Sequence, residues 1–143
     1  MAKRRMFTLD IVDSDAFLTL PLSAQALYFH LGMRADDDGF VGKPITIMKS
    51  IGANSVDMEL LIQKKFVLYF DEEGVIVVKH WWMHNQKRKD RYTETTYKKL
   101  ANSLYLNDNG AYTFDKTNSK YIVWQPSGNQ TATQDKLSKD KLS

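Results

Sequence analysis

Two short basic segments carry the side chains of this sequence that are best suited to binding a polyanion. One segment lies near the start of the chain, and the other follows a pair of tryptophans in its second half. Lys and Arg pair with phosphate oxygens, Asn and Gln bond to base edges, and Tyr stacks on bases. We therefore expect the two segments to clamp the backbone of a nucleic acid. Their candidate binding residues are Lys3, Arg4, Arg5, Asn85, Lys87, Arg88, Lys89, Arg91 and Tyr92.

The distribution of charge supports this expectation. The net charge is only +3, but residues 76–99 hold seven basic and two acidic residues, whereas residues 1–75 are net negative. A concentrated basic block indicates a contact with a polyanion more strongly than diffuse charge does. Two alternatives stay open. The block is a solvated basic surface, or Arg88 and Arg91 pair with Asp90, Glu94 or the acidic residues 71–73 and so dock the helix that follows.

Patterns typical of catalysis or metal binding are missing or incomplete. His80 and His84 have a spacing that binds metal on a helix, but the sequence has no Cys, and no carboxylates converge on them. The run Asp36–Gly39 resembles part of a calcium loop without its alternating ligands, so we interpret it as a turn. No glycine-rich phosphate loop or activated serine is found. We expect no enzymatic activity, no metal and no cofactor.

Apolar residues at helical spacing predict the elements that position the basic segments. An extended lead-in is followed by a short helix over residues 14–18, capped by Ser14 or Asp13. Ser23 caps a longer helix that runs to about residues 34–35, since apolar side chains recur along it with a helical period. After the acidic turn, Phe40–Val41 predicts one small strand.

Two further helices follow, joined by a tight turn. Pro44 suits the first turn of one helix, which Gly52 ends. Asn54 or Ser55 caps the next helix, which runs to about Lys65. Two short helices with a glycine-containing turn between them are typical of a helix-turn-helix.

A β-hairpin comes directly after this pair of helices. Residues 66–70 and 75–78 are rich in aromatic and β-branched side chains, and the acidic loop 71–74 joins them. The strand at Phe40–Val41 would complete a three-stranded sheet. The order of elements predicts an α+β fold, namely a winged helix-turn-helix with a small antiparallel sheet, followed by a C-terminal extension.

In a winged helix the second helix of the helix-turn-helix, here the helix that runs to about Lys65, usually enters the major groove of DNA. We call it the third helix below, because the helix capped by Ser23 counts as the first. Asp57 and Glu59 would then face the phosphates, and the tip of the hairpin is also acidic, so a protein-binding surface stays an alternative. The candidate DNA-binding residues on this helix are Asn54, Ser55, Gln63 and Lys64.

The C-terminal third gives weaker signals. Trp81 and Trp82 would point to opposite faces of a strand, so we expect only one of them in the core. Thr93 caps a helix through residue 101, and short strands are expected at residues 111–114 and 120–124. The expected organisation is a winged-helix DNA-binding domain (1–92), an accessory helix and hairpin (93–124), and a disordered polar tail (125–143).

Several separated blocks of the sequence resemble the N-terminal domain of phage replisome organisers. These are DnaD-like replication initiation proteins of phages and prophages in Gram-positive bacteria. The resemblance implies a winged helix that binds phage origin DNA and helps to recruit the replicative helicase or its loader. Members usually continue beyond this point, so it also implies that the chain is a truncated or short variant. The blocks are Met1–Phe7, Asp13–Phe17, Leu22–Leu31, Ala35–Val41, Ile51–Asn54, His84–Asn85 and Arg88–Tyr92.

The expected function is binding of double-stranded DNA in the initiation of phage or prophage replication, with the helicase or its loader as a protein partner. The alternatives are a winged-helix adaptor that binds proteins and a phage transcriptional regulator. The chain could also form a homo-oligomer, with Leu104, Tyr105 and Leu106 as candidate contact residues. No stretch approaches the ~18 apolar residues of a membrane span. We therefore expect no membrane contact and a place in the cytoplasm of the bacterial host.

Overall fold

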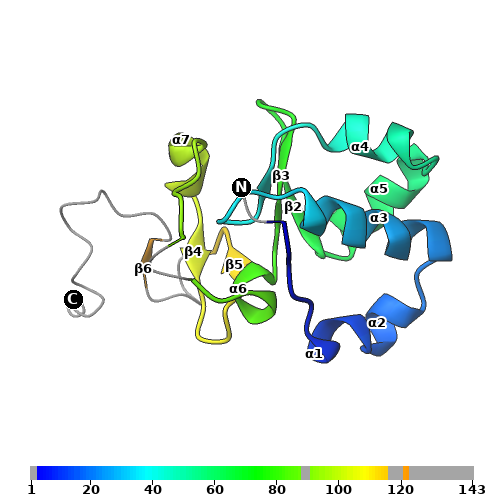
Figure 1. Ribbon diagram of the computed structural model, residues 1–143, viewed down its shortest axis with the longest axis horizontal. Helices are drawn as coiled ribbons and strands as arrows, with labels where there is room; N and C mark the ends of the chain where they lie inside the picture. The colour runs from blue at the N-terminus through cyan, green and yellow to red at the C-terminus, as the bar shows by residue number, and fades with distance from the viewer. Residues whose placement is uncertain (1–2, 88–90, 116–120, 123–143) are drawn as a thin grey trace.

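A three-stranded antiparallel sheet lies at the centre of this α+β fold, between a layer of helices and a second small sheet (Figure 1). The computed structural model describes residues 3–87, 91–115 and 121–122. The elements in these residues are α1 (Leu9–Val12), α2 (Asp15–Leu18), α3 (Leu22–Met33), β1 (Phe40–Val41), α4 (Pro44–Ser50), α5 (Ser55–Gln63), β2 (Val67–Phe70), β3 (Val75–Val78), α6 (Trp81–His84), α7 (Lys98–Ala101), β4 (Tyr105–Leu106), β5 (Tyr112–Thr113) and β6 (Tyr121–Ile122).

The central sheet has the strand order β1-β3-β2, with Phe40 opposite Val77 and Val67 opposite Val78. Helices α3, α4 and α5 lie on one side of it, and β4, β5 and α7 lie on the other (Figure 1). All four residues of β3 are buried, as is typical of a strand that is covered on both faces. The predicted hairpin and its pairing with Phe40–Val41 are confirmed.

Local hydrogen bonds explain where the helices begin and end. The Asn54 side chain accepts from the Asp57 amide, and the Asp57 carboxylate accepts from the Asn54 amide, so α5 begins with a capping box. At its end, the Phe66 amide donates to the Leu61 carbonyl and the Lys65 amide to the Ile62 carbonyl. This is a Schellman motif, and it holds Lys65 at a φ of +62°.

Two predicted features of the first helices are wrong. The lead-in contains the short helix α1, whose first turn Thr8 caps by accepting from the Asp10 amide. Ser23 does not cap α3, because the helix begins one residue earlier, with Pro21 at the N-cap position. The Ser23 hydroxyl instead donates to Asp57 Oδ1 at 2.7 Å and joins α3 to α5. The predicted cap of α2 by Ser14 is confirmed.

The tryptophan pair lies on a single helical turn, α6, and not on a strand. Trp81 is buried and donates from its indole Nε1 to the Asp37 carbonyl at 2.9 Å. Trp82 is half-buried and donates to the Tyr112 hydroxyl at 2.8 Å. The strand prediction failed because four residues are too few to show a period, although one tryptophan is in the core, as expected.

The second sheet has the order β5-β4-β6 and shares one hydrophobic cluster with the rest of the fold. Leu104 is fully buried in this cluster, so it cannot form the exposed self-association contact that the sequence predicted. Thr93 does not cap α7, which begins at Lys98 after Tyr97, and the Thr93 amide donates to Asp37 Oδ2. The strand predicted at residues 111–114 is shorter in the structure and comprises β5, whereas of the strand predicted at residues 120–124 only the two residues of β6 are described.

The boundaries predicted at residues 92 and 124 stay predictions, and the polar tail (125–143) lies outside the described residues. Within residues 3–87, 91–115 and 121–122, no helix has the length and apolar character needed to cross a membrane.

Candidate nucleic-acid interface

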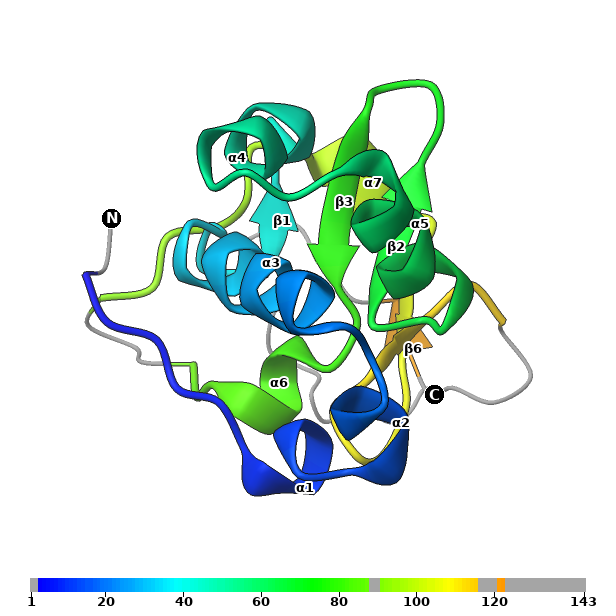
Figure 2. The same ribbon diagram turned by 90° about the vertical axis from the view of Figure 1, so that its right-hand side faces the viewer.

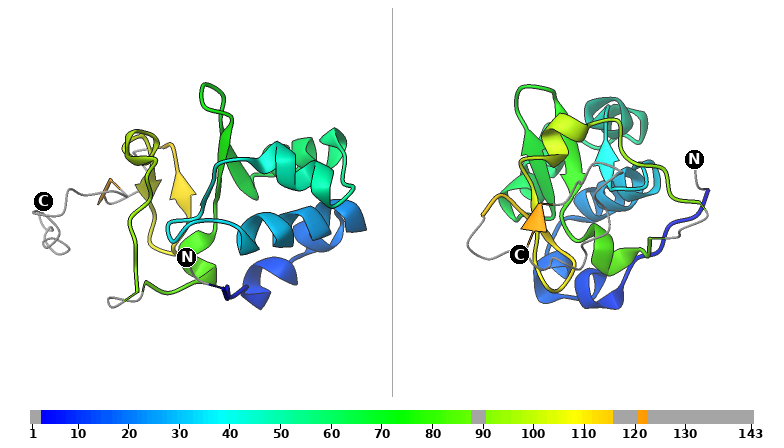
Figure 3. Two further views of the ribbon diagram at one scale, coloured as in Figure 1. Left: turned by 45° about the horizontal axis from the view of Figure 1, so that its top comes forward. Right: turned by 90° about the vertical axis from the view of Figure 1, so that its left-hand side faces the viewer.

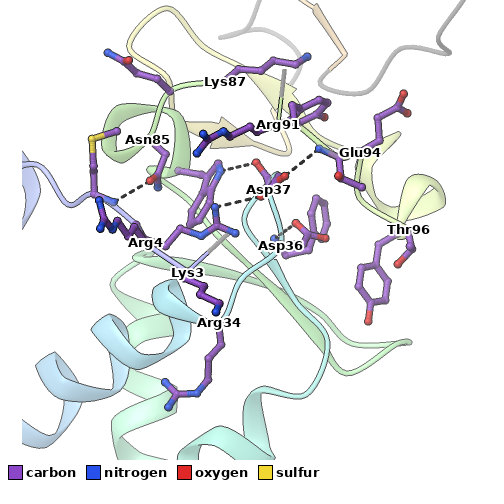
Figure 4. A pocket seen from close by; sticks show the side chains of 18 of the residues that line it. Lys3, Arg4, Arg34, Asp36, Asp37, Asn85, Lys87, Arg91, Glu94 and Thr96 are labelled. Carbon is purple, nitrogen blue, oxygen red and sulfur yellow. Dashed lines mark hydrogen bonds and ion pairs between the residues drawn. The ribbon is translucent and has the colours of Figure 1, made fainter. Parts of the chain in front are cut away.

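An open groove of about 1200 Å³ lies where four separated segments of the chain meet. These are the N-terminal segment, the turn after α3, the end of α6 and the residues that lead to α7 (Figure 4). In the right-hand view of Figure 3, the N-terminal segment runs beside the chain that follows α6. The basic residues lining the groove are Lys3, Arg4, Arg5, Arg34, Lys87 and Arg91, and the acidic ones are Asp36, Asp37 and Glu94.

The N-terminal basic segment is held in place by backbone hydrogen bonds to α6 and its cap. The Met6 amide donates to Asn85 Oδ1, and the Thr8 amide donates to His84 Nδ1, both at 2.9 Å. These bonds join segments that are 79 and 76 residues apart in the chain. Arg5 is thereby placed inside the groove wall, whereas Lys3 and Arg4 are exposed at its rim.

Arg5 makes three kinds of contact at once. Its Nη1 lies 3.2 Å from Asp37 Oδ1, its Nη2 donates to the Ala35 carbonyl at 2.7 Å, and its guanidinium lies 5.0 Å from the Trp81 ring centroid. Its side chain is only 7% exposed. Arg5 is therefore a fixed part of the site, in contrast to a free surface cation.

His84 is the anchor beneath this segment. Because a backbone amide can only donate, Nδ1 of His84 must accept from Thr8, so Nε2 carries the proton and faces the Tyr28 hydroxyl at 2.6 Å. Burial, with a smaller effect from His80, lowers the pKa of His84 to about 4. Both ring nitrogens are occupied within the protein. In the parts of the chain that the structure describes, no group of three or more His, Cys, Asp or Glu side chains is arranged so that it could hold a metal ion.

The three consecutive aspartates form a hub of hydrogen bonds at the edge of the groove. Asp36 Oδ1 closes the turn by accepting from the Asp38 and Phe40 amides. Asp38 is 5% exposed and accepts from the Tyr92 hydroxyl at 2.7 Å and the Thr95 amide at 2.8 Å. Burial raises the pKa values of Asp36 and Asp38. The sequence predicted only a turn here, because the partners of these carboxylates lie more than 50 residues further along the chain.

The second basic segment lies against this hub. Tyr92 is held by Asp38, and Lys87 Nζ lies 4.3 Å from the centroid of the Tyr92 ring. Arg91 and Asn85 also line the groove. Arg88 and Lys89 lie outside the described residues. The structure therefore brings together Lys3, Arg4, Arg5, Asn85, Lys87, Arg91 and Tyr92 from the predicted set.

Arg34 is a lining residue that the sequence did not single out. It follows α3 and donates to the His30 carbonyl at 3.1 Å, a position where a basic side chain also interacts favourably with the end of a helix. The available signal was its place directly before the acidic turn. That signal also fits an ordinary helix end, so it did not identify a binding residue.

The four candidates at the predicted third helix do not line the groove. Asn54 uses its side chain to cap α5, and Ser55, Gln63 and Lys64 are exposed. The N-terminal segment and α5 lie on opposite sides of α3 in Figure 2. The structure therefore places these four residues away from the basic groove, and their predicted contact with DNA stays a prediction.

Asp57 also differs from its predicted place. It is 3% exposed, because it accepts from the Ser23 hydroxyl and the Asn54 amide, and it does not face a ligand. The exposed surface of α5 is thus less acidic than the sequence indicated, with Glu59 as its exposed acidic residue. The hairpin tip remains acidic, since Asp71, Glu72 and Glu73 are exposed.

The groove offers cationic donors above aromatic side chains, an arrangement that can bind anions without transforming them. No protein-family model matches this chain, and neither a curated protein nor a solved structure shows significant similarity to it.

Proposed function

We propose that this protein binds double-stranded DNA without catalysis, and that the groove contacts the phosphates. The observation that supports the proposal most directly is the meeting of the two basic segments, which hydrogen bonds join across 79 residues of chain. Six basic side chains outnumber three acidic ones along its lining. Arg5 is held in place by the fold, so it loses little side-chain freedom when it contacts a polyanion.

We further propose that residues 22–78 are a winged helix, with α4 and α5 as the helix-turn-helix and β2–β3 as the wing. The order α3-β1-α4-α5-β2-β3 and the β1-β3-β2 sheet support this proposal. Its contact with DNA would differ from the common mode, because the basic groove lies apart from α5 and the hairpin tip is acidic.

A role in the initiation of phage replication is proposed on the resemblance to replisome organisers alone. A phage transcriptional regulator would use the same DNA-binding surface. Mapping of the bound sites on phage DNA would separate the two roles: binding at the replication origin supports the first, and binding at promoters supports the second.

Binding of a helicase or its loader is a second candidate function, located at the α3–α5 face. Leu22 is 81% exposed and Val56 is 58% exposed, and the Ser23–Asp57 hydrogen bond brings their helix ends together. Exposed apolar side chains that lie together on one face can form part of a protein contact. A pull-down repeated after nuclease treatment tests this role, since a partner that is lost with the nucleic acid was not bound by this face.

The DNA-binding proposal is tested by fluorescence polarisation with random duplex DNA across a salt series. We expect a log–log slope of about −3 to −5, because each neutralised phosphate contributes roughly −0.9. The double variant Lys3→Ala/Lys87→Ala should lower affinity at least tenfold and reduce the slope by about 2.

The matched control is Lys49→Ala/Lys64→Ala, which removes the same charge from exposed positions on α4 and after α5. We expect it to change affinity by less than about threefold. A larger effect of this control than of the groove variant would place the DNA on α5 and contradict the proposal. Absence of binding at low salt would favour the protein-binding role.

A further inference from the structure

Two buried hydrogen-bond donors in the groove wall have no acceptor among the residues that the structure describes. They are Nε of Arg5 and Nδ2 of Asn85, and both residues line the groove. A buried donor without a partner destabilises a fold, because the hydrogen bond that it made with water is lost and not replaced. Native proteins keep few such groups, and each one calls for an explanation. Two of them at one surface, among cations, indicate a position prepared for an acceptor.

The direction of the Arg5 donor is fixed by its other contacts. Nη1 pairs with Asp37, Nη2 donates to the Ala35 carbonyl, and the guanidinium plane lies over Trp81. Nε is the guanidinium nitrogen that these contacts leave without a partner, in a side chain that is only 7% exposed. Arg5 cannot turn Nε to a new partner without breaking the ion pair with Asp37.

The Asn85 amide is oriented just as firmly. The Met6 amide can only donate, so the atom of Asn85 that faces it must be Oδ1. The NH₂ group then has no choice of direction. Because Met6 follows Arg5 in the chain, the Met6–Asn85 hydrogen bond holds the Asn85 side chain next to the stretch of groove wall that carries Arg5.

The surrounding charge selects the kind of anion. Lys3, Arg4, Arg34 and Lys87 line the same groove (Figure 4) and supply positive charge to it, but Asp37 lies beside Arg5 and repels negative charge. A monoanion is therefore favoured over a dianion. The backbone phosphodiester of a nucleic acid carries one negative charge and presents two oxygens that accept hydrogen bonds.

We propose that Nε of Arg5 and Nδ2 of Asn85 form a discrete subsite for one phosphodiester. This inference rests on the proposed function, and it assigns the best-defined contact within the groove. Shielding from water strengthens the two hydrogen bonds.

Charge-matched variants separate this subsite from general attraction. Arg5→Lys keeps the positive charge but removes Nε, and Arg4→Lys measures the ordinary effect of the same exchange at the groove rim. Asn85→Asp keeps the acceptor for Met6 but removes the donor, and Gln86→Glu measures the effect of one added negative charge. We expect Arg5→Lys to weaken duplex binding at least fivefold more than Arg4→Lys. Asn85→Asp should likewise weaken duplex binding at least fivefold more than Gln86→Glu. Because Arg5→Lys keeps the charge, it should change the salt dependence of binding only slightly.

A direct measurement on the unaltered protein avoids any effect of these variants on folding. The side-chain NMR signals of Arg5 Nε–H and Asn85 Nδ2–H₂ are followed while dimethyl phosphate, the simplest phosphodiester anion, is added. Both signals should shift together and saturate, and a short duplex should shift them in the same direction.

The outcomes distinguish the subsite from the function on which it rests. Signals that stay in place while duplex binds would remove the subsite and leave DNA binding intact. Saturable shifts with dimethyl phosphate, but no binding of duplex, would support the subsite and contradict the proposed function. Shifts produced by acetate as strongly as by dimethyl phosphate would show a carboxylate site and overturn the assignment to a phosphodiester.

Discussion

Tyr92 shows how one hydroxyl supports both the fold and the groove. It donates to both carboxylate oxygens of Asp38, and this bond opposes the effect of burial, which raises the pKa of Asp38. The ring of Tyr92 also lies under Lys87. A hydrogen bond to a buried charged group is typically worth more than one between neutral groups.

We expect Tyr92→Phe to lower the free energy of unfolding by about 1–3 kcal/mol at neutral pH. The loss should shrink in acid, because a protonated Asp38 no longer carries a charge that needs the donor. Urea unfolding at several pH values measures this effect. Tyr69→Phe, on the exposed side of β2, is the control and should change stability by less than about 0.5 kcal/mol.

His84 links stability to pH. An unfolded histidine binds a proton below its ordinary pKa of about 6.5, whereas burial keeps folded His84 neutral down to about 4. The unfolded chain therefore binds more protons in this window, and the contribution of His84 to stability is lost as the pH falls from 6.5 to 4.

The predicted change is up to about 1.4 kcal/mol per pH unit from this residue. His84→Gln should have a flatter dependence of unfolding free energy on pH between 4 and 6.5 than the unaltered protein. The two profiles must be compared because other groups also contribute to the pH dependence of stability. The raised pKa values of Asp36 and Asp38 make the folded state more stable as the pH falls, which is opposite to the effect of His84. Parallel profiles would contradict the role assigned to His84.

At the scale of elements, the end of α5 holds Lys65 in a left-handed conformation that favours glycine. A residue with an L side chain in this conformation is strained by roughly 1–2 kcal/mol. In addition, the pKa of Lys79 is lowered by burial and, to a smaller extent, by repulsion from Lys65. Lys65→Gly should therefore stabilise the protein by about 1 kcal/mol in thermal or urea unfolding. Lys64→Gly, one residue earlier at φ −86°, should destabilise it.

The elements that the sequence predicted well are those with strong local signals. Asn54, Pro44 and the apolar run of β3 each fix their element through neighbouring residues. The predictions that were wrong concern residues whose hydrogen-bond partners are distant in the sequence. Ser23 is bonded to Asp57 in place of its own helix, and the Thr93 amide is bonded to Asp37. Such contacts leave no trace in local spacing.

At the scale of the whole molecule, the same limit applies to the site. Charge alone identified both basic segments, because clustering of Lys and Arg is visible in the sequence. It could not show that the segments meet, since their contact depends on the Met6–Asn85 and Thr8–His84 bonds. It also could not show that α5 lies outside the groove, or that the aspartate turn organises one wall of it.

The shared core gives a test of the predicted boundary at residue 92. Tyr112 is fully buried, and its hydroxyl donates to the Asp38 carbonyl at 2.6 Å. Leu104 and Ala101 fill the same cluster. We expect a fragment of residues 1–92 to lack a cooperative thermal transition by circular dichroism, whereas residues 1–122 should retain one. A cooperative transition in the shorter fragment would show that the boundary is a true domain boundary.

The bonds between the N-terminal segment and the end of α6 also set a schedule during protein synthesis. Lys3, Arg4 and Arg5 leave the ribosome before the side chains that complete their groove, which are made about 80 residues later. At a synthesis rate of about 5–20 residues per second, the interval is several seconds. The nascent chain thus carries an unassembled basic segment until His84, Asn85 and Tyr92 have emerged. The proposed binding of a polyanion in the groove therefore becomes possible only after these residues have been synthesised.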